Sequence, residues 1–199
     1  MSRMTVRLAA TGAAVVLALT AASGAASADT TATVTPAAGQ AVVTTDVNFL
    51  SGAALNGIVI IPLQPANPAY AQATGLTLTF PVSGGSANIP AFDGDVQFGG
   101  GLLFFNLTTG KSVTFKQLDY SAANGYFTAV PDGSTARVPV LDAAGNDVFS
   151  HSGLTQTLTS DSFEVDAVGA KYLDANLGTT YFKGGQKVGT LALSYTPAH

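Results

Sequence analysis

Residues 76–82, Leu-Thr-Leu-Thr-Phe-Pro-Val, decide the fold class, because large apolar residues alternate with threonine along them. On an extended chain the apolar side chains face one side and the threonines the other, which predicts a half-buried strand. Similar short runs rich in Val, Ile, Phe, Tyr and Thr recur along the chain, separated by Gly, Pro, Asn and Asp. We expect further strands at residues 42–50, 58–61, 95–98, 102–107, 153–159, 162–165 and 187–195.

Local turn and cap signals organise these strands. Residues 111–120 and 125–130 predict a hairpin with its turn near 121–124, and Pro131-Asp132-Gly133 predicts another turn. Prolines 62, 65 and 68 exclude a central strand or a helix interior there. Residues 166–177 predict one helix, with Gly178 as its C-terminal cap. The fold class is therefore all-β: an antiparallel β-sandwich or flattened barrel of about ten short strands with one short helix near the C-terminus.

The first 28 residues read as a cleaved, Sec-type signal peptide. Arg3 and Arg7 form a positive region, residues 8–20 are apolar, and Ala26-Ser27-Ala28 matches a small-residue cleavage site. Residues 29–40 are small and polar and predict a flexible leader, and residues 41–199 predict a single domain. We therefore expect a secreted protein, with no integral membrane segment after cleavage.

Composition excludes several function classes. The 199 residues include no cysteine, which excludes disulfides, Cys-type zinc sites and thiol catalysis. Only 10% of the residues are charged and the formal net charge is −4, which becomes −6 without the signal peptide. The remaining basic residues are scattered rather than clustered, so nucleic acid is not an expected partner.

Catalytic and metal-binding patterns are weak. The histidines are His151 and the C-terminal His199, and the sole glutamate is Glu164, so a serine hydrolase or a carboxylate pair lacks its usual partners. Asp93 with Asp95 could converge on one group, and the 142–147 loop offers oxygen ligands of the kind that calcium accepts. Turn residues around Gly94 explain the first pattern equally well, and an ordinary hairpin turn explains the second better than a calcium site does. We therefore expect neither an enzyme nor a metal site.

Four stretches carry a family resemblance. They are FPVSGG at 80–85, GDVQFGGGLLFF at 94–105, VTFKQLDYSAANGYFTAVP at 113–131 and SFEVDAVGAKYLDANLGTTYFKGGQKVGTLALSY at 162–195. Together they resemble secreted actinobacterial β-sandwich domains related to the haem-transport-associated (HtaA-type) surface proteins. The resemblance implies a β-sandwich outside the cell and haem bound through an early tyrosine with a histidine nearby. Asn48-Phe49 stands where that tyrosine is expected, so the resemblance assigns no haem ligand in this chain.

Aromatic residues are the remaining candidates for binding. In a strand, one residue of each adjacent aromatic pair faces outward, and exposed rings on a rigid domain suit a glycan, a peptide or a porphyrin. For haem, an outward tyrosine is the expected anionic ligand and His151 a second candidate. Most such residues, however, simply pack in the core or at a strand edge. The candidate ligand-binding residues are Tyr120, Tyr126, His151 and Tyr181.

These observations predict a secreted, non-catalytic binding or structural module of the bacterial cell surface or extracellular space. The alternative is a carrier of haem or a small hydrophobic ligand, and the third hypothesis is a secreted carbohydrate-active hydrolase. The partners that remain open are a cell-wall polymer, another surface protein and self-association. Self-association is included because few charges guard strands such as residues 102–107 against pairing at an edge.

Overall fold

The computed structural model describes residues 34–72 and 74–199. The expected signal peptide and the start of the expected leader lie outside these residues, and the first strand already begins at Ala38. The strands are β1 (Ala38–Thr45), β2 (Ile58–Leu63), β3 (Asn67–Ala71), β4 (Gly75–Asn88), β5 (Asp93–Phe98), β6 (Gly101–Asn106), β7 (Ser112–Ser121), β8 (Tyr126–Pro131), β9 (Val138–Ala143), β10 (Val148–Ser152), β11 (Thr155–Val165) and β12 (Gln186–Thr196). Two α-helices, α1 (Val47–Leu55) and α2 (Ala167–Leu177), and a short 3-10 helix (Ile89–Ala91) complete the described elements.

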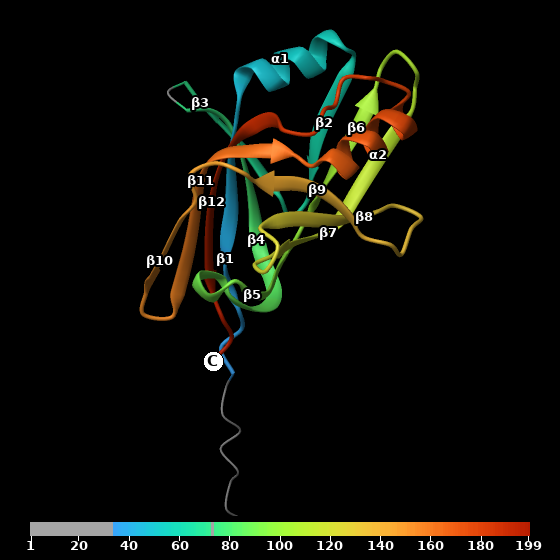
Figure 1. Cartoon of the computed structure of the whole chain (residues 1–199). Coiled ribbons are helices and arrows are strands. Elements are labelled where there is room, and N and C mark those ends of the chain that lie inside the picture. Colours follow the sequence, from blue (N-terminus) through green and yellow to red (C-terminus); the bar gives the residue numbers. More distant parts are fainter. Residues whose placement is uncertain (1–33, 73) are drawn as a thin grey trace, which may run out of the picture. The chain divides into compact units, whose positions relative to one another are not determined.

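The sheet closes on itself. Strands β7-β5-β4-β1-β12-β11-β9-β8 pair in that order, and β8 pairs back with β7, so eight antiparallel strands form a barrel. The other strands extend from this ring: β6 and β2 continue outward from β7, β3 pairs with β4, and β10 pairs with β11. The expected antiparallel all-β class is correct, although twelve strands and two α-helices replace the expected ten strands and one helix. Figure 1 shows α1 lying across one end of the barrel.

The strand predicted for residues 42–50 is wrong in its second half, where the chain forms α1 instead. The Asp46 carboxylate caps this helix by accepting hydrogen bonds from the backbone N–H groups of Asn48 (2.7 Å) and Phe49 (3.4 Å). Phe49 and Ala53, four residues apart, then bury one face of the helix. The side-chain cap and the buried face outweigh the β-propensity of the preceding valines, which ends the strand at Thr45.

Pro62 and Pro68 lie away from the centre of the sheet, as the sequence analysis predicted. Among the described residues, Pro62 is in β2, which pairs only with β6, and Pro68 is in β3, which pairs only with β4. An edge strand tolerates proline because the missing N–H can face away from the partner strand. The expected hairpin is present as β7 and β8.

The C-terminal part of the chain follows the prediction closely. The runs at 153–159 and 162–165 join into β11, which carries a bulge between Ser160 and Phe163. Helix α2 is capped by Asp166, whose carboxylate accepts from the N–H of Val168 at 2.6 Å. The helix ends at Gly178, which takes the left-handed conformation at φ +67°.

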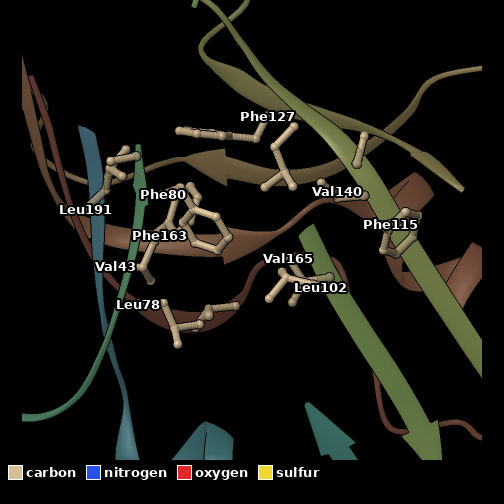
Figure 2. Close-up of a cluster of buried hydrophobic side chains, with 14 of the residues drawn as sticks. Val43, Leu78, Phe80, Leu102, Phe115, Phe127, Val140, Phe163, Val165 and Leu191 are labelled. Atoms are coloured by element: carbon tan, nitrogen blue, oxygen red, sulfur yellow. The ribbon is translucent and has the colours of Figure 1, made fainter. Parts of the chain in front are cut away.

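The hydrophobic core fills the barrel. Leu78 and Phe80 point inward from β4, as the alternation of residues 76–82 predicts. Phe127 lies at the centre of an aromatic cluster, with ring centroids 5.0 Å from Tyr120, 5.1 Å from Phe163 and 5.7 Å from Phe98. Figure 2 shows side chains from several strands, among them Phe80, Phe127 and Phe163, filling the space between the ribbons. A rigid framework of this kind can hold a binding site at its end.

Candidate binding site

A small apolar cavity lies inside the barrel, with a volume of about 80 Å³. Phe49 of α1 and Leu173 of α2 are among its lining residues, and Thr45 is the one polar residue among them. Ligand pockets usually measure about 300–1,000 Å³. An apolar cavity of about 150 Å³ takes a guest the size of benzene. In this conformation the interior is therefore too small for haem or any ligand of similar size.

A larger depression opens on the surface where the end of α1 meets the loop that joins α2 to β12. Its volume is about 510 Å³, within the range of ligand sites. Amide, hydroxyl and ammonium groups, one aromatic ring and two glycines line it. The lining residues are Asn56, Thr180, Tyr181, Lys183, Gly184, Gly185 and Gln186.

Tyr181 lines this depression and is bonded to α1. Its hydroxyl donates a hydrogen bond of 2.6 Å to the backbone carbonyl of Phe49, which with Leu50 is one of two α1 residues that line the cavity. Its ring tilts against Phe49 at a centroid distance of 6.0 Å and meets Phe182 edge-on at 5.0 Å. The fit is close at Gly52, where a Cβ would lie 3.0 Å from the Tyr181 hydroxyl.

The environment of Tyr181 keeps its phenol protonated at neutral pH. Burial is the largest influence and raises the pKa of this phenol, while hydrogen bonds with the Gln186 side chain and the Ala53 backbone act in the opposite direction. The hydrogen bond to the Phe49 carbonyl itself requires the proton. Tyr181 is therefore a hydrogen-bonding and packing group of the depression.

The other predicted binding residues lie elsewhere. Tyr120 is 1% exposed within the core, and burial, aided by the charge of Asp147, raises its pKa to about 12. Tyr126 is half-buried and pairs with Asp142 on the outer face of the barrel. His151 is exposed on β10. The structure does not bring the four candidates together, and of the four only Tyr181 lines the depression.

Sequence analysis missed two exposed aromatic residues, Tyr70 and Phe92, and most of the polar lining. Tyr70 is 77% exposed on β3, opposite Leu76, in a proline-rich stretch that was not expected to form a strand. Asn56 lies at the end of α1, Lys183 in the loop before β12 and Gln186 at the first position of β12, where no periodic pattern marks them. The hairpin signals could not show that the end of α1 meets the segment between α2 and β12.

Three carboxylates lie together next to the start of α2. Asp142 and Glu164 are cross-strand neighbours, and Asp142 also shares a hydrogen bond with Asp166. Burial, the charges of Asp166 and Glu164, and this hydrogen bond raise the pKa of Asp142 to about 6. Hydrogen-bonded carboxyls lie closer than the roughly 5–5.5 Å that a retaining glycosidase needs. None of the three lines the cavity or the depression.

The 142–147 loop, whose oxygen groups are of the kind that calcium accepts, is held against β11 by hydrogen bonds. Asn146 donates hydrogen bonds of 2.8 Å from its backbone and from its side chain to the Asp161 carboxylate. Within residues 34–72 and 74–199, no group of three His, Cys, Asp or Glu side chains is arranged to hold a metal ion. Among the helices of the same residues, none is long and apolar enough to span a bilayer.

Comparison with known proteins supports the fold. No family model and no curated protein matches the chain. The C-terminal domain of HtaA from Corynebacterium glutamicum is similar in structure, with a TM-score of 0.54 and 14% identity over 81% of this chain and 99% of that domain. The haem-binding protein HtaB from the same organism gives a TM-score of 0.46 and 15% identity over 83% of this chain and 95% of its own. The HtaA match confirms the resemblance indicated by the sequence, at the level of the fold.

Proposed function

We propose that this chain is a secreted, non-catalytic binding module of the bacterial cell surface or extracellular space. The depression beside Tyr181 supports the proposal, because it is already formed and is held by a hydrogen bond between segments 132 residues apart. The signal-like residues 1–28 support export. A preformed depression on a rigid barrel binds without first having to order its own residues.

The chemistry of the depression favours a saccharide among the ligands that the sequence left open. Its amide and hydroxyl side chains, from Asn56, Thr180 and Gln186, can exchange hydrogen bonds with sugar hydroxyls. The Tyr181 ring offers an apolar edge and Lys183 a single positive charge. A polymer of the cell wall, neutral or weakly anionic, carries groups that these side chains can bind. It is therefore the partner class that we propose.

Haem carriage is the second candidate, and the described residues do not fit a haem. The depression contains one iron-ligand candidate, Tyr181, whose hydroxyl is directed to the Phe49 carbonyl and whose pKa is raised. A tyrosinate ligand would have to give up that hydrogen bond. No histidine lines the depression, and Tyr70, the exposed tyrosine of β3, lines neither hollow.

Two titrations of the mature protein, residues 29–199, separate these candidates. Calorimetry with an N-acetylglucosamine tetramer should show binding that Lys183→Ala weakens about tenfold, the loss expected for one hydrogen bond to a charged group. Lys171→Ala removes an exposed lysine on α2 and should leave binding unchanged. A saturable Soret band with haemin, lost in Tyr181→Phe or Tyr70→Phe, would instead establish the haem carrier. No binding of the tetramer would refute the saccharide proposal.

A further inference from the structure

Strand β2 is an open edge with an apolar outer face. Among the described residues β2, β3 and β10 each pair with one other strand. Neither β2 (IVIIPL) nor its partner β6 (GLLFFN) contains a charged residue. Val59 and Ile61 are 37% and 42% exposed on the outer face of β2, opposite Phe105 and Leu103 of β6. Soluble proteins usually protect such an edge with charges, bulges or a covering segment.

The hydrogen-bonding groups on the open edge can be assigned. The N–H of Leu107 donates to the carbonyl of Gly57 (2.8 Å), so the odd-numbered backbone groups of this strand face β6. Pro62 agrees with this assignment, because its nitrogen has no hydrogen to give to β6. In an antiparallel strand the alternate residues face the other side. The N–H groups of Ile58 and Ile60, and the carbonyls of Ile58, Ile60 and Pro62, therefore face the open edge.

We propose that β2 pairs with β2 of a second copy of this chain, antiparallel about a two-fold axis at Ile60. In this register the Ile60 N–H and carbonyl of each copy meet those of the other. Each Ile58 N–H meets the carbonyl of Pro62 in the second copy, so the missing proline N–H falls at the end of the ladder. On the outer face Val59 of one copy lies opposite Ile61 of the other, an apolar cross-strand pair.

A second copy suits this surface better than another partner does. The β2–β6 ribbon has no charged side chain with which a charged polymer or peptide could pair. Although this protein is net negative, two such ribbons can therefore join without repulsion between like charges at the contact. The other open edges are less suited, since β3 is exposed along its whole length and β10 carries Ser150, His151 and Ser152. Six residues of strand span about 20 Å, which gives an interface below roughly 1,200 Å² and hence a weak dimer.

Sedimentation of the mature protein from about 5 to about 500 µM tests this proposal. We expect reversible dimerisation with a micromolar Kd. Ile61→Lys adds a charge to the outer face and should weaken the dimer at least tenfold. Val148→Lys adds the same charge at the 59%-exposed Val148 of β10 and should leave the dimer unchanged.

A backbone variant separates strand pairing from a simple charge effect. Ile60→Pro removes an N–H that faces the open edge and no N–H that faces β6, so the fold should persist by circular dichroism while dimerisation is lost. A protein that stays monomeric throughout the concentration range overturns the proposal. So does a dimer that Ile61→Lys and Ile60→Pro leave intact, or one that Val148→Lys weakens as much as Ile61→Lys does.

Discussion

Removing the Tyr181 hydroxyl should weaken the attachment of α1 by a calculable amount. Tyr181→Phe deletes the 2.6 Å hydrogen bond to the Phe49 carbonyl and leaves the ring contacts with Phe49 and Phe182 in place. A hydrogen bond of this kind contributes about 0.5–1.5 kcal/mol. The extra penalty for an unsatisfied carbonyl should be small, because a helical carbonyl also accepts from the N–H four residues on. We expect the free energy of unfolding to fall by about 1 kcal/mol.

Urea denaturation and amide hydrogen exchange measure this loss. The α1 amides should exchange about fivefold faster in Tyr181→Phe, since local opening of the helix no longer breaks the bond. Tyr172→Phe is the matched control, because Tyr172 is a half-buried tyrosine whose ring packs on Phe115 at 5.7 Å, and its change should stay within about 0.5 kcal/mol. Equal losses in the two variants, or unchanged exchange in α1, would refute the role given to Tyr181.

Three further predictions concern the core, a cap and the carboxylate cluster. Phe127→Ala empties the aromatic centre next to an existing cavity and should cost about 3–5 kcal/mol, seen as a lower urea midpoint; a midpoint unchanged from wild type would contradict the packing described. Asp46→Ala should cost about 1 kcal/mol in the same assay, since it removes the cap of α1. Because the folded-state pKa of Asp142 is raised to about 6, its contribution favours folding at low pH and is lost as pH rises through 6. Asp142→Asn should therefore raise the free energy of unfolding more at pH 8 than at pH 5. A larger gain at pH 5, measured by denaturation at both pH values, would exclude the assigned shift.

Local patterns predicted the elements whose structure is decided locally. The predictions from the alternation at residues 76–82 and from the cap signals around α2 are correct, because residues close in sequence both carry the pattern and make the stabilising interactions. The helix at Val47–Leu55 was missed because one side chain, Asp46, reverses the preference of the valines before it. Closure of the barrel rests on β7 pairing with both β5 and β8, which no local signal encodes.

The candidate site was harder to predict than the strands. Alternation alone does not show which face of a strand is the inner one, so Tyr120, which stands between Asp119 and Ser121, was placed among the binding candidates and lies in the core. Tyr181 was found because it is aromatic, whereas Asn56 and Lys183 join it only through the packing of α1 against a distant loop. The tight contact between Gly52 and the Tyr181 ring likewise becomes visible only when the two segments are placed together.

Backbone amide chemical-shift mapping with the N-acetylglucosamine tetramer tests the proposed binding site most directly. We predict saturable shifts in the ¹⁵N–¹H spectrum that concentrate at Thr180, Lys183, Gly184 and Gln186, with α1 amides near Asn56 following. The remaining strands of the barrel should keep their positions. Shifts that concentrate on another face, or no shifts while haemin binds with a saturable Soret band, would contradict the site and the saccharide class together.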